Sequence, residues 1–259
     1  MAGFTSEAIL LRKIEYGDHD YIITFMTENL GKVSVMAKNA KKSVKRFQGA
    51  LDPFSVMNIE CTYSKTRRDA LAYLMSARLE APFAGIRTDA VKTGYASYWV
   101  EILNSYLEAE KEQIELYQLL MESLAALDKG MVAKEVLNLL FQIRFMTIAG
   151  FSPDFVCCGK CRVPIDRIRE GSVVFDFKDG RFFCGRCANR TSETGIKVSK
   201  GTLKQLFWIN NNGIQKVERI RFSPISIREG EQILEAFVPC HMGRDFKSLG
   251  FLRRVRSCL

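Results

Sequence analysis

Four of the eight cysteines fall into two matched pairs, and each pair has two residues between its members. Cys158-Gly159-Lys160-Cys161 is followed, after 22 residues, by Cys184-Gly185-Arg186-Cys187. Two such pairs can present four thiolates to one tetrahedral zinc ion. Because four thiolates leave zinc no open coordination position, the spacing predicts one structural Zn²⁺ ion bound by Cys158, Cys161, Cys184 and Cys187.

The segment between the two pairs favours a metal-bound ribbon. Residues 173–177 and 182–183 are mostly apolar and flank a turn at Asp179-Gly180, as in a β-hairpin. Two alternatives stay open. Cys157 stands next to Cys158 and could replace it as a ligand, although only Cys158 keeps the two-residue spacing and the following glycine. A redox dithiol is the other interpretation, but one metal explains two matched pairs better.

A second feature is a run of positive charge. Residues 38–46 hold five basic side chains and no acidic one, and they come directly after a predicted strand. A basic loop in that position suits the phosphates of single-stranded nucleic acid. The candidate contacts are Lys38, Lys41, Lys42, Lys45 and Arg46, with Arg67 and Arg68 of another predicted turn extending the surface. The alternative is a solvated loop without a partner.

Residues for catalysis are sparse. The two histidines, His19 and His241, lie far apart in the sequence and outside any metal-ligand or nucleophile motif. The chain contains no phosphate-binding glycine motif and no nucleophile elbow. We therefore expect neither an enzyme nor a small-molecule substrate.

The first 80 residues must form the elements that position the basic run. Apolar and polar residues alternate over 32–38, 57–63 and 71–79, and residues 8–14 and 21–26 are apolar and β-branched. Five short strands separated by turn-like stretches predict a small barrel, with a generic β-sandwich fragment as the alternative.

The rest of the chain reads as helical around the cysteine pairs. Apolar residues recur at three- and four-residue steps over 91–107, 114–127 and 131–150. Residues 202–209 predict a short helix after the cysteines. Ser226 and Glu229 have capping-box spacing and predict the start of another, which Pro239 would end or kink. The cysteine module is therefore expected to be inserted into one helical domain.

The net charge of the chain indicates which class of partner it binds. The chain of 259 residues has a net charge of +9, which favours an anionic partner. The net charge is +3 over residues 1–80, −3 over 81–150, +3 over 151–199 and +6 over 200–259. No secretory signal or membrane span is recognised, so we expect a cytoplasmic protein without a membrane partner. In the cytoplasm, cysteines bind metal or stay reduced.

Several stretches, in order, resemble the RecO family of bacterial recombination mediators. They are residues 7–11, 16–24, 31–42, 151–155 leading into the first cysteine pair, and 247–249. Two departures from the family pattern are Asp18 in place of the usual Glu and Asn39 in place of the usual Gly. Lysines also replace the arginines at 41 and 42. Because Asn tolerates left-handed backbone, the turn at Asn39 should survive.

The resemblance implies an α+β protein: an N-terminal OB-fold β-barrel (residues 1–80), then an α-helical domain (81–152 and 199–259) with an inserted four-cysteine zinc module (153–198). It also implies DNA repair and homologous recombination without catalysis. RecO-like proteins bind single- and double-stranded DNA and anneal complementary strands. With RecR they help load RecA onto DNA coated by the single-strand-binding protein SSB, whose acidic C-terminal tail they contact. Such a protein would be cytoplasmic and associated with the nucleoid.

Two other hypotheses remain. An RNA-binding OB/zinc protein of RNA processing or translation would favour exposed aromatic side chains and respond to the 2′-hydroxyl. A zinc enzyme would need an open metal position. The C-terminal segment, with its net charge of +6, is the candidate surface for an acidic tail, and no motif places the RecR site.

Overall fold

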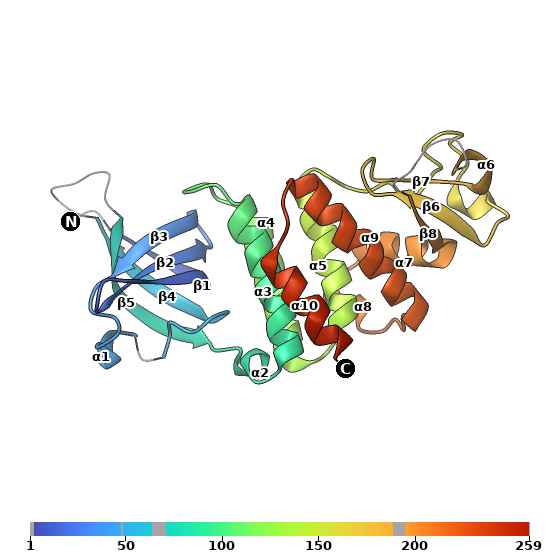
Figure 1. Cartoon of the computed structure of the whole chain (residues 1–259). Coiled ribbons are helices and arrows are strands. Elements are labelled where there is room, and N and C mark those ends of the chain that lie inside the picture. Colours follow the sequence, from blue (N-terminus) through green and yellow to red (C-terminus); the bar gives the residue numbers. More distant parts are fainter. Residues whose placement is uncertain (1–2, 48, 64–70, 189–194, 259) are drawn as a thin grey trace. The chain divides into compact units, whose positions relative to one another are not determined.

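The computed structural model describes residues 3–47, 49–63, 71–188 and 195–258. Arg67 and Arg68 lie outside these residues, as does the side chain of Lys45. The chain divides into two compact units, Met1–Asp128 and Lys129–Leu259 (Figure 1). The domain boundaries expected at residues 80, 152 and 198 stay predictions.

The first unit begins with a closed five-stranded barrel. Its strands are β1 (Gly3–Tyr16), β2 (Asp20–Thr27), β3 (Gly31–Ala37), β4 (Val56–Thr62) and β5 (Ala72–Ala81). Their order around the barrel is β1-β2-β3-β5-β4, and β3 and β5 pair in parallel while the other neighbours are antiparallel. The predicted barrel is confirmed, and the β-sandwich alternative is wrong.

Alternation of side chains builds the barrel core. In β3, Val33, Val35 and Ala37 are buried while Ser34 is exposed, as the period of two requires. Gly31 opens this strand with φ +67°, and a Cβ at this position would lie 1.8 Å from the carbonyl oxygen of Lys111. Only glycine therefore allows the segment after α3 (Ala90–Tyr106) to approach β3 so closely.

Helices accompany the barrel in the described residues of the first unit, the last of them ending at the boundary with the second unit. They are α1 (Val44–Phe47), α2 (Ala84–Arg87), α3 and α4 (Ile114–Lys129). Asp89 caps α3 by accepting hydrogen bonds from the backbone N–H groups of Val91 and Lys92. The Tyr117 hydroxyl of α4 donates to Glu7 of β1 at 2.8 Å. That bond fixes α4 against the barrel.

The helices of the second unit are α5 (Lys134–Ile148), α7 (Lys200–Asn210), α8 (Ile214–Val217), α9 (Pro224–Met242) and α10 (Lys247–Ser257). Helix α5 packs against α7 and α9. The capping box predicted at Ser226 is wrong, because Ser223 is the N-cap of α9 and accepts from the Ser226 N–H at 3.1 Å. Pro239 does not end α9, which continues to Met242 and stops at Gly243 with φ +62°.

Helix α10 was not expected from the sequence. Only Leu249 and Leu252 of this helix are buried, and ion pairs supply much of its attachment. Arg256 pairs with both Glu231 and Glu235 of α9, and Arg253 pairs with Glu235 at 2.8 Å. The carboxylate of Glu235 is only 6% exposed. Two of the C-terminal arginines are thus neutralised within the fold.

The cysteine module contains a three-stranded sheet. Strands β6 (Ser172–Asp176) and β7 (Arg181–Phe183) form the predicted hairpin, and Gly180 in its turn has φ +65°. Strand β8 (Gly195–Ser199) adds to the other edge of β6 and was missed by the sequence analysis. The 3-10 helix η1 (Ile165–Arg167) and the short helix α6 (Gly185–Ala188) complete the module.

Candidate metal centre and nucleic-acid interface

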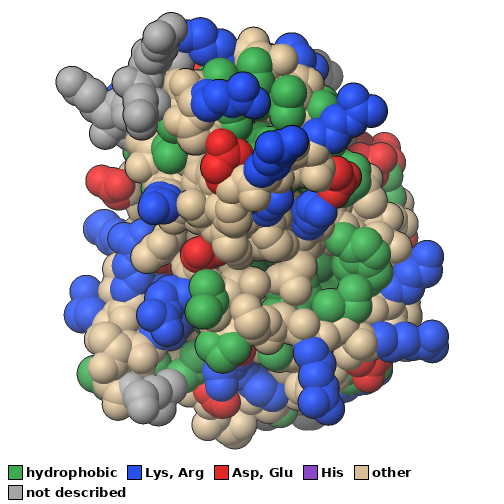
Figure 2. All heavy atoms as spheres, turned by 90° about the vertical axis from the view of Figure 1, so that its right-hand side faces the viewer, with side chains coloured by type: hydrophobic (Ala, Val, Ile, Leu, Met, Phe, Trp, Pro, Cys, Tyr) green, Lys and Arg blue, Asp and Glu red, His purple; other side chains and the backbone are tan. Residues whose placement is uncertain are grey.

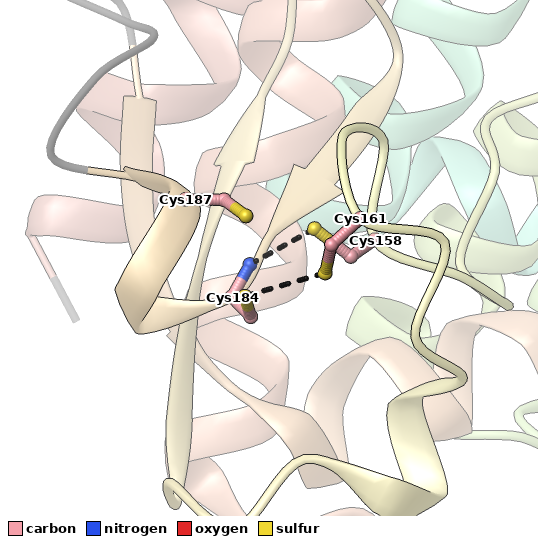
Figure 3. A group of neighbouring side chains, drawn as sticks. All are labelled: Cys158, Cys161, Cys184 and Cys187. Carbon is pink, nitrogen blue, oxygen red and sulfur yellow. Dashed lines mark hydrogen bonds between the residues drawn. The ribbon is translucent and has the colours of Figure 1, made fainter.

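The four predicted cysteines come together in the second unit. Their sulfur atoms all lie within 4.8 Å of one another. The Sγ atoms of Cys161 and Cys184 are 3.8 Å apart, and the four side chains converge from the turn at 158–161 and from the start of α6 (Figure 3). Cys157 is not a member of this group. The group can bind a tetrahedral metal ion.

Backbone hydrogen bonds shape each pair. In the first, the Arg162 N–H donates to the carbonyl of Cys158 at 3.0 Å, and Arg162 takes φ +58°. In the second, the Cys187 N–H donates to the carbonyl of Cys184 at 2.8 Å. The Cys184 N–H also donates to the Cys158 sulfur at 3.4 Å. A main-chain N–H of the second pair thus contacts a sulfur of the first.

Gly159 lets the first pair approach the sheet. Its N–H donates to the carbonyl of Phe182 in β7 at 2.8 Å. A Cβ on Gly159 would lie 3.0 Å from the ring of Phe183. A glycine at this position therefore permits the close packing that brings Cys158 and Cys161 to the second pair.

The thiols differ in their acidity. Burial raises the pKa of Cys158, but hydrogen bonds from the backbone N–H groups of Cys184, Cys161 and Lys160 lower that pKa more, to about 6. Loss of hydration, together with hydrogen bonds among the neighbouring thiols, raises the pKa of Cys187 to about 12. Four adjacent thiolates need a cation to hold them, which is the chemistry that a divalent metal supplies.

The basic run predicted at the barrel forms an ordered turn followed by α1, and not a simple loop. Asn39 adopts φ +54°, the left-handed conformation expected for this residue. Its N–H donates to the Asp20 carboxylate at 2.7 Å, and the Lys41 N–H donates to the carbonyl of His19 at 3.1 Å. These bonds fix the turn between β3 and α1 to the turn between β1 and β2. We call residues 38–46 the basic turn.

The cations of the basic turn have different surroundings. Lys38 Nζ lies 4.5 Å from the ring centroid of Tyr73. Lys41 Nζ lies 2.8 Å from the Glu15 carboxylate and 5.6 Å from the ring of Tyr21. Arg46 donates to the carbonyl of Lys38 and to the Ser43 hydroxyl. Lys42 is exposed.

One basic residue next to this surface escaped the sequence analysis. Lys13 of β1 places Nζ 5.2 Å from the ring of Tyr21, the same ring that Lys41 approaches, and donates to the carbonyl of Leu51 at 2.7 Å. Lysines therefore lie close to two half-buried tyrosine rings, Tyr21 and Tyr73, around the basic turn. Surfaces that combine cations with aromatic rings are typical of single-stranded nucleic-acid sites. Arg67 and Arg68, the other predicted contacts, fall outside the described residues.

The described part of the chain has no helix long and apolar enough to cross a bilayer.

Comparison with protein families identifies the family to which this architecture belongs. A family described as the N-terminal part of recombination protein O matches residues 1–83, and its C-terminal counterpart matches residues 87–250. The chain belongs to the RecO family. The resemblance inferred from short stretches of sequence is thereby confirmed. The barrel lies within the N-terminal match, and most of the helical region lies within the C-terminal match.

Full-length RecO proteins from other bacteria resemble the whole chain. The "DNA repair protein RecO" of Desulfosudis oleivorans is 37% identical over 259 residues, covering 99% of both chains. That of Desulfatibacillum aliphaticivorans is 39% identical over 256 residues, with 99% and 98% coverage. The protein of Syntrophus aciditrophicus, which carries the same name, is 31% identical over 252 residues, with 97% and 95% coverage. These names favour DNA repair over the RNA-binding alternative.

Proposed function

We propose that the protein is a DNA repair and recombination mediator that binds single- and double-stranded DNA and anneals complementary strands. With RecR, it would assist RecA loading onto DNA coated by SSB. The observation that carries this proposal is the basic turn on the barrel of a RecO-family chain. It offers Lys38, Lys41, Lys42, Lys45 and Arg46 as contacts to phosphates, with Arg67 and Arg68 proposed as a further part of the same surface.

Annealing requires that a strand be held by its backbone while its bases stay free to pair. Cations near Tyr21 and Tyr73 meet the first condition, because Lys and Arg bind phosphates without reading sequence. Two tyrosine rings also allow transient stacking of bases, which tolerates any sequence. The proposed role is one of binding, so it needs no catalytic residue.

Zinc is the proposed occupant of the cysteine group. Its tetrahedral preference and its affinity for thiolates match Cys158, Cys161, Cys184 and Cys187, whose sulfurs lie within 4.8 Å of one another. The ion would hold the two cysteine turns and the hairpin β6–β7 together. With four thiolate ligands, zinc serves structure, which argues against the zinc-enzyme hypothesis.

The partners of the proposed reaction are RecR, RecA indirectly, and the acidic C-terminal tail of SSB, in the nucleoid region of the cytoplasm. The C-terminal segment remains the proposed surface for that tail. Arg253 and Arg256 are already paired with Glu235 and Glu231, so the segment offers less free charge than its net of +6 suggests.

The test is the annealing rate of complementary strands, bare and coated with SSB, over a series of salt concentrations. The proposal predicts annealing on both substrates and a steep decline with salt, since phosphate contacts release counterions. Matched RNA strands run in parallel distinguish the RNA-binding alternative. Wild-type protein that carries zinc but anneals neither DNA substrate contradicts the proposal.

A further inference from the structure

A second group of cations surrounds a pocket beside the cysteine group. The pocket has a volume of about 460 Å³, large enough for a nucleotide. Arg167 of η1, Arg169 of the segment before β6 and Arg186 of α6 all line it. Cys161 and Cys184 form one wall, and Glu170 is its single acidic residue among the described ones.

The three arginines lack a protein partner within the described ranges of the chain. Among the residues that the structure describes, none of their guanidinium groups forms an ion pair or a hydrogen bond, and all three side chains are exposed. Two acidic residues elsewhere in the module form ion pairs with other cations: Asp166 pairs with Lys204, and Asp154 lies 3.5 Å from Arg162. Figure 2 shows the face of the molecule that carries the module, with many Lys and Arg side chains spread across it.

We propose that Arg167, Arg169 and Arg186 bind a backbone phosphate of nucleic acid, which makes the cysteine module a second DNA-binding site. The planar guanidinium group donates two parallel hydrogen bonds to phosphate oxygens, and three such groups around one pocket surround an anion. This inference rests on the proposed function. It adds a second strand contact, remote in sequence from the basic turn, which is the arrangement that pairing two strands calls for.

The metal centre offers the arginines a competing role. Four thiolates around a divalent ion carry a formal charge of −2, and neighbouring cations would offset it. No hydrogen bond joins the three guanidinium groups to a sulfur within the part of the chain that the structure describes. They line the open pocket and are thus available to a ligand from solvent. The experiment separates the two roles by measuring zinc as well as DNA.

The test uses the full chain and the R167Q/R186Q variant, with K178Q/K197Q as a control that removes the same charge from exposed lysines of the same module outside the pocket. The probe is a fluorescent single-stranded oligonucleotide titrated at several salt concentrations. Zinc content and the thermal midpoint are measured on each sample. R167K/R186K tests whether charge alone restores binding.

The expected result is that R167Q/R186Q weakens binding about tenfold at low salt and lowers the salt slope by about 0.7, the value for one phosphate contact on a single strand. K178Q/K197Q should stay close to wild type, and R167K/R186K should recover part of the loss. Unchanged binding by R167Q/R186Q overturns the proposal that the arginine pocket binds DNA. The proposed function still stands in that case if charge reversal in the basic turn abolishes binding. Loss of zinc in R167Q/R186Q also overturns it, because the arginines would then serve the metal centre. Wild-type protein that binds no DNA overturns both proposals.

Discussion

The ammonium group of Lys41 lies 2.8 Å from the carboxylate of Glu15. Glu15 lies near the end of β1, just before the turn between β1 and β2 that is hydrogen-bonded to the basic turn. The carboxylate is 74% exposed and the lysine side chain 24%. The hydrogen bond from Lys41 lowers the pKa of Glu15 below its ordinary value, so this carboxylate, already charged at neutral pH, stays charged further into the acid range. Lys41 is therefore a basic-turn lysine whose charge is already partly neutralised, whereas Lys42 forms no ion pair with the described residues.

Removing the carboxylate of Glu15 should strengthen DNA binding. E15Q releases Lys41 and deletes a negative charge beside the proposed phosphate contacts of the basic turn. Affinity for single-stranded DNA should therefore rise about threefold at low salt and return to the wild-type value at high salt. E80Q is the matched control, because Glu80 pairs with Arg78 near the opposite end of β5 from Tyr73. Fluorescence anisotropy measures both. Weaker binding by E15Q would contradict this prediction and show that Glu15 holds Lys41 in a position that favours DNA binding.

Each cysteine of the group should be needed for the metal. C158S and C184S are expected to lower zinc stoichiometry from one per chain towards zero and to cost about 4 kcal/mol or more of stability, because loss of a structural metal is among the largest single-residue effects. C240S replaces an exposed cysteine outside the group and should keep its zinc. C157S decides the ligand assignment: normal zinc supports Cys158, whereas metal loss in C157S with normal zinc in C158S reverses it.

Glu229 should stabilise the start of α7 in a pH-dependent manner. Its carboxylate accepts hydrogen bonds from the Ser199 N–H at 3.0 Å, from the Ser199 hydroxyl at 2.8 Å and from Thr202. Burial raises the pKa of Glu229, but these bonds lower it more, so the folded pKa falls below 4.5. The stabilisation is therefore complete above the unfolded value of 4.5 and disappears as the pH falls through the folded pKa.

The E229Q variant measures this effect. It should reduce the free energy of unfolding by about 1 kcal/mol at pH 7, the usual cost of a lost charged hydrogen bond or cap, and the difference from wild type should shrink under acid conditions. Urea titrations at pH 7 and at several values below 4.5 give the comparison. A difference that stays constant down to the lowest pH would rule out the carboxylate as its source.

The ion pairs of α10 should carry much of that helix's stability. R256Q leaves the largely buried Glu235 and Glu231 short of a partner and should destabilise the protein by about 3 kcal/mol. Burial raises the pKa of Glu231, so this carboxylate in particular depends on Arg256 to stay charged. R254Q changes an exposed neighbour and should cost little. Equal thermal midpoints for the two variants would contradict this role for Arg256.

The sequence predicts the barrel well because its signal is local. Val33, Val35 and Ala37 alternate with polar neighbours over one strand, and the cysteine pairs fix their own spacing. Asn39 likewise signals its own left-handed turn. Each of these features depends on residues within a few positions of one another, so period and composition suffice to find it.

Features that depend on distant partners were missed. Glu229 has the spacing of a capping residue, yet it caps α7, whose Ser199 lies 30 positions earlier. Arg256 looks like part of a free basic tail until α9 supplies Glu231 and Glu235. Arg167, Arg169 and Arg186 meet around one pocket only after the module folds. Pro239 lies in the last turn of α9, where its missing N–H removes one hydrogen bond and the helix survives.

The central claim is that the basic turn holds DNA by its phosphates, and charge reversal there tests it most directly. K38E/K42E is compared with wild type and with K178E/K197E, which makes the same charge change on the cysteine module outside the arginine pocket. Affinity for a single-stranded oligonucleotide is measured from about 50 mM salt upwards.

The account predicts that K38E/K42E folds normally, loses at least about tenfold in affinity at low salt, and shows a shallower dependence on salt, while K178E/K197E binds nearly as well as wild type. Wild-type affinity and salt dependence in K38E/K42E would contradict it.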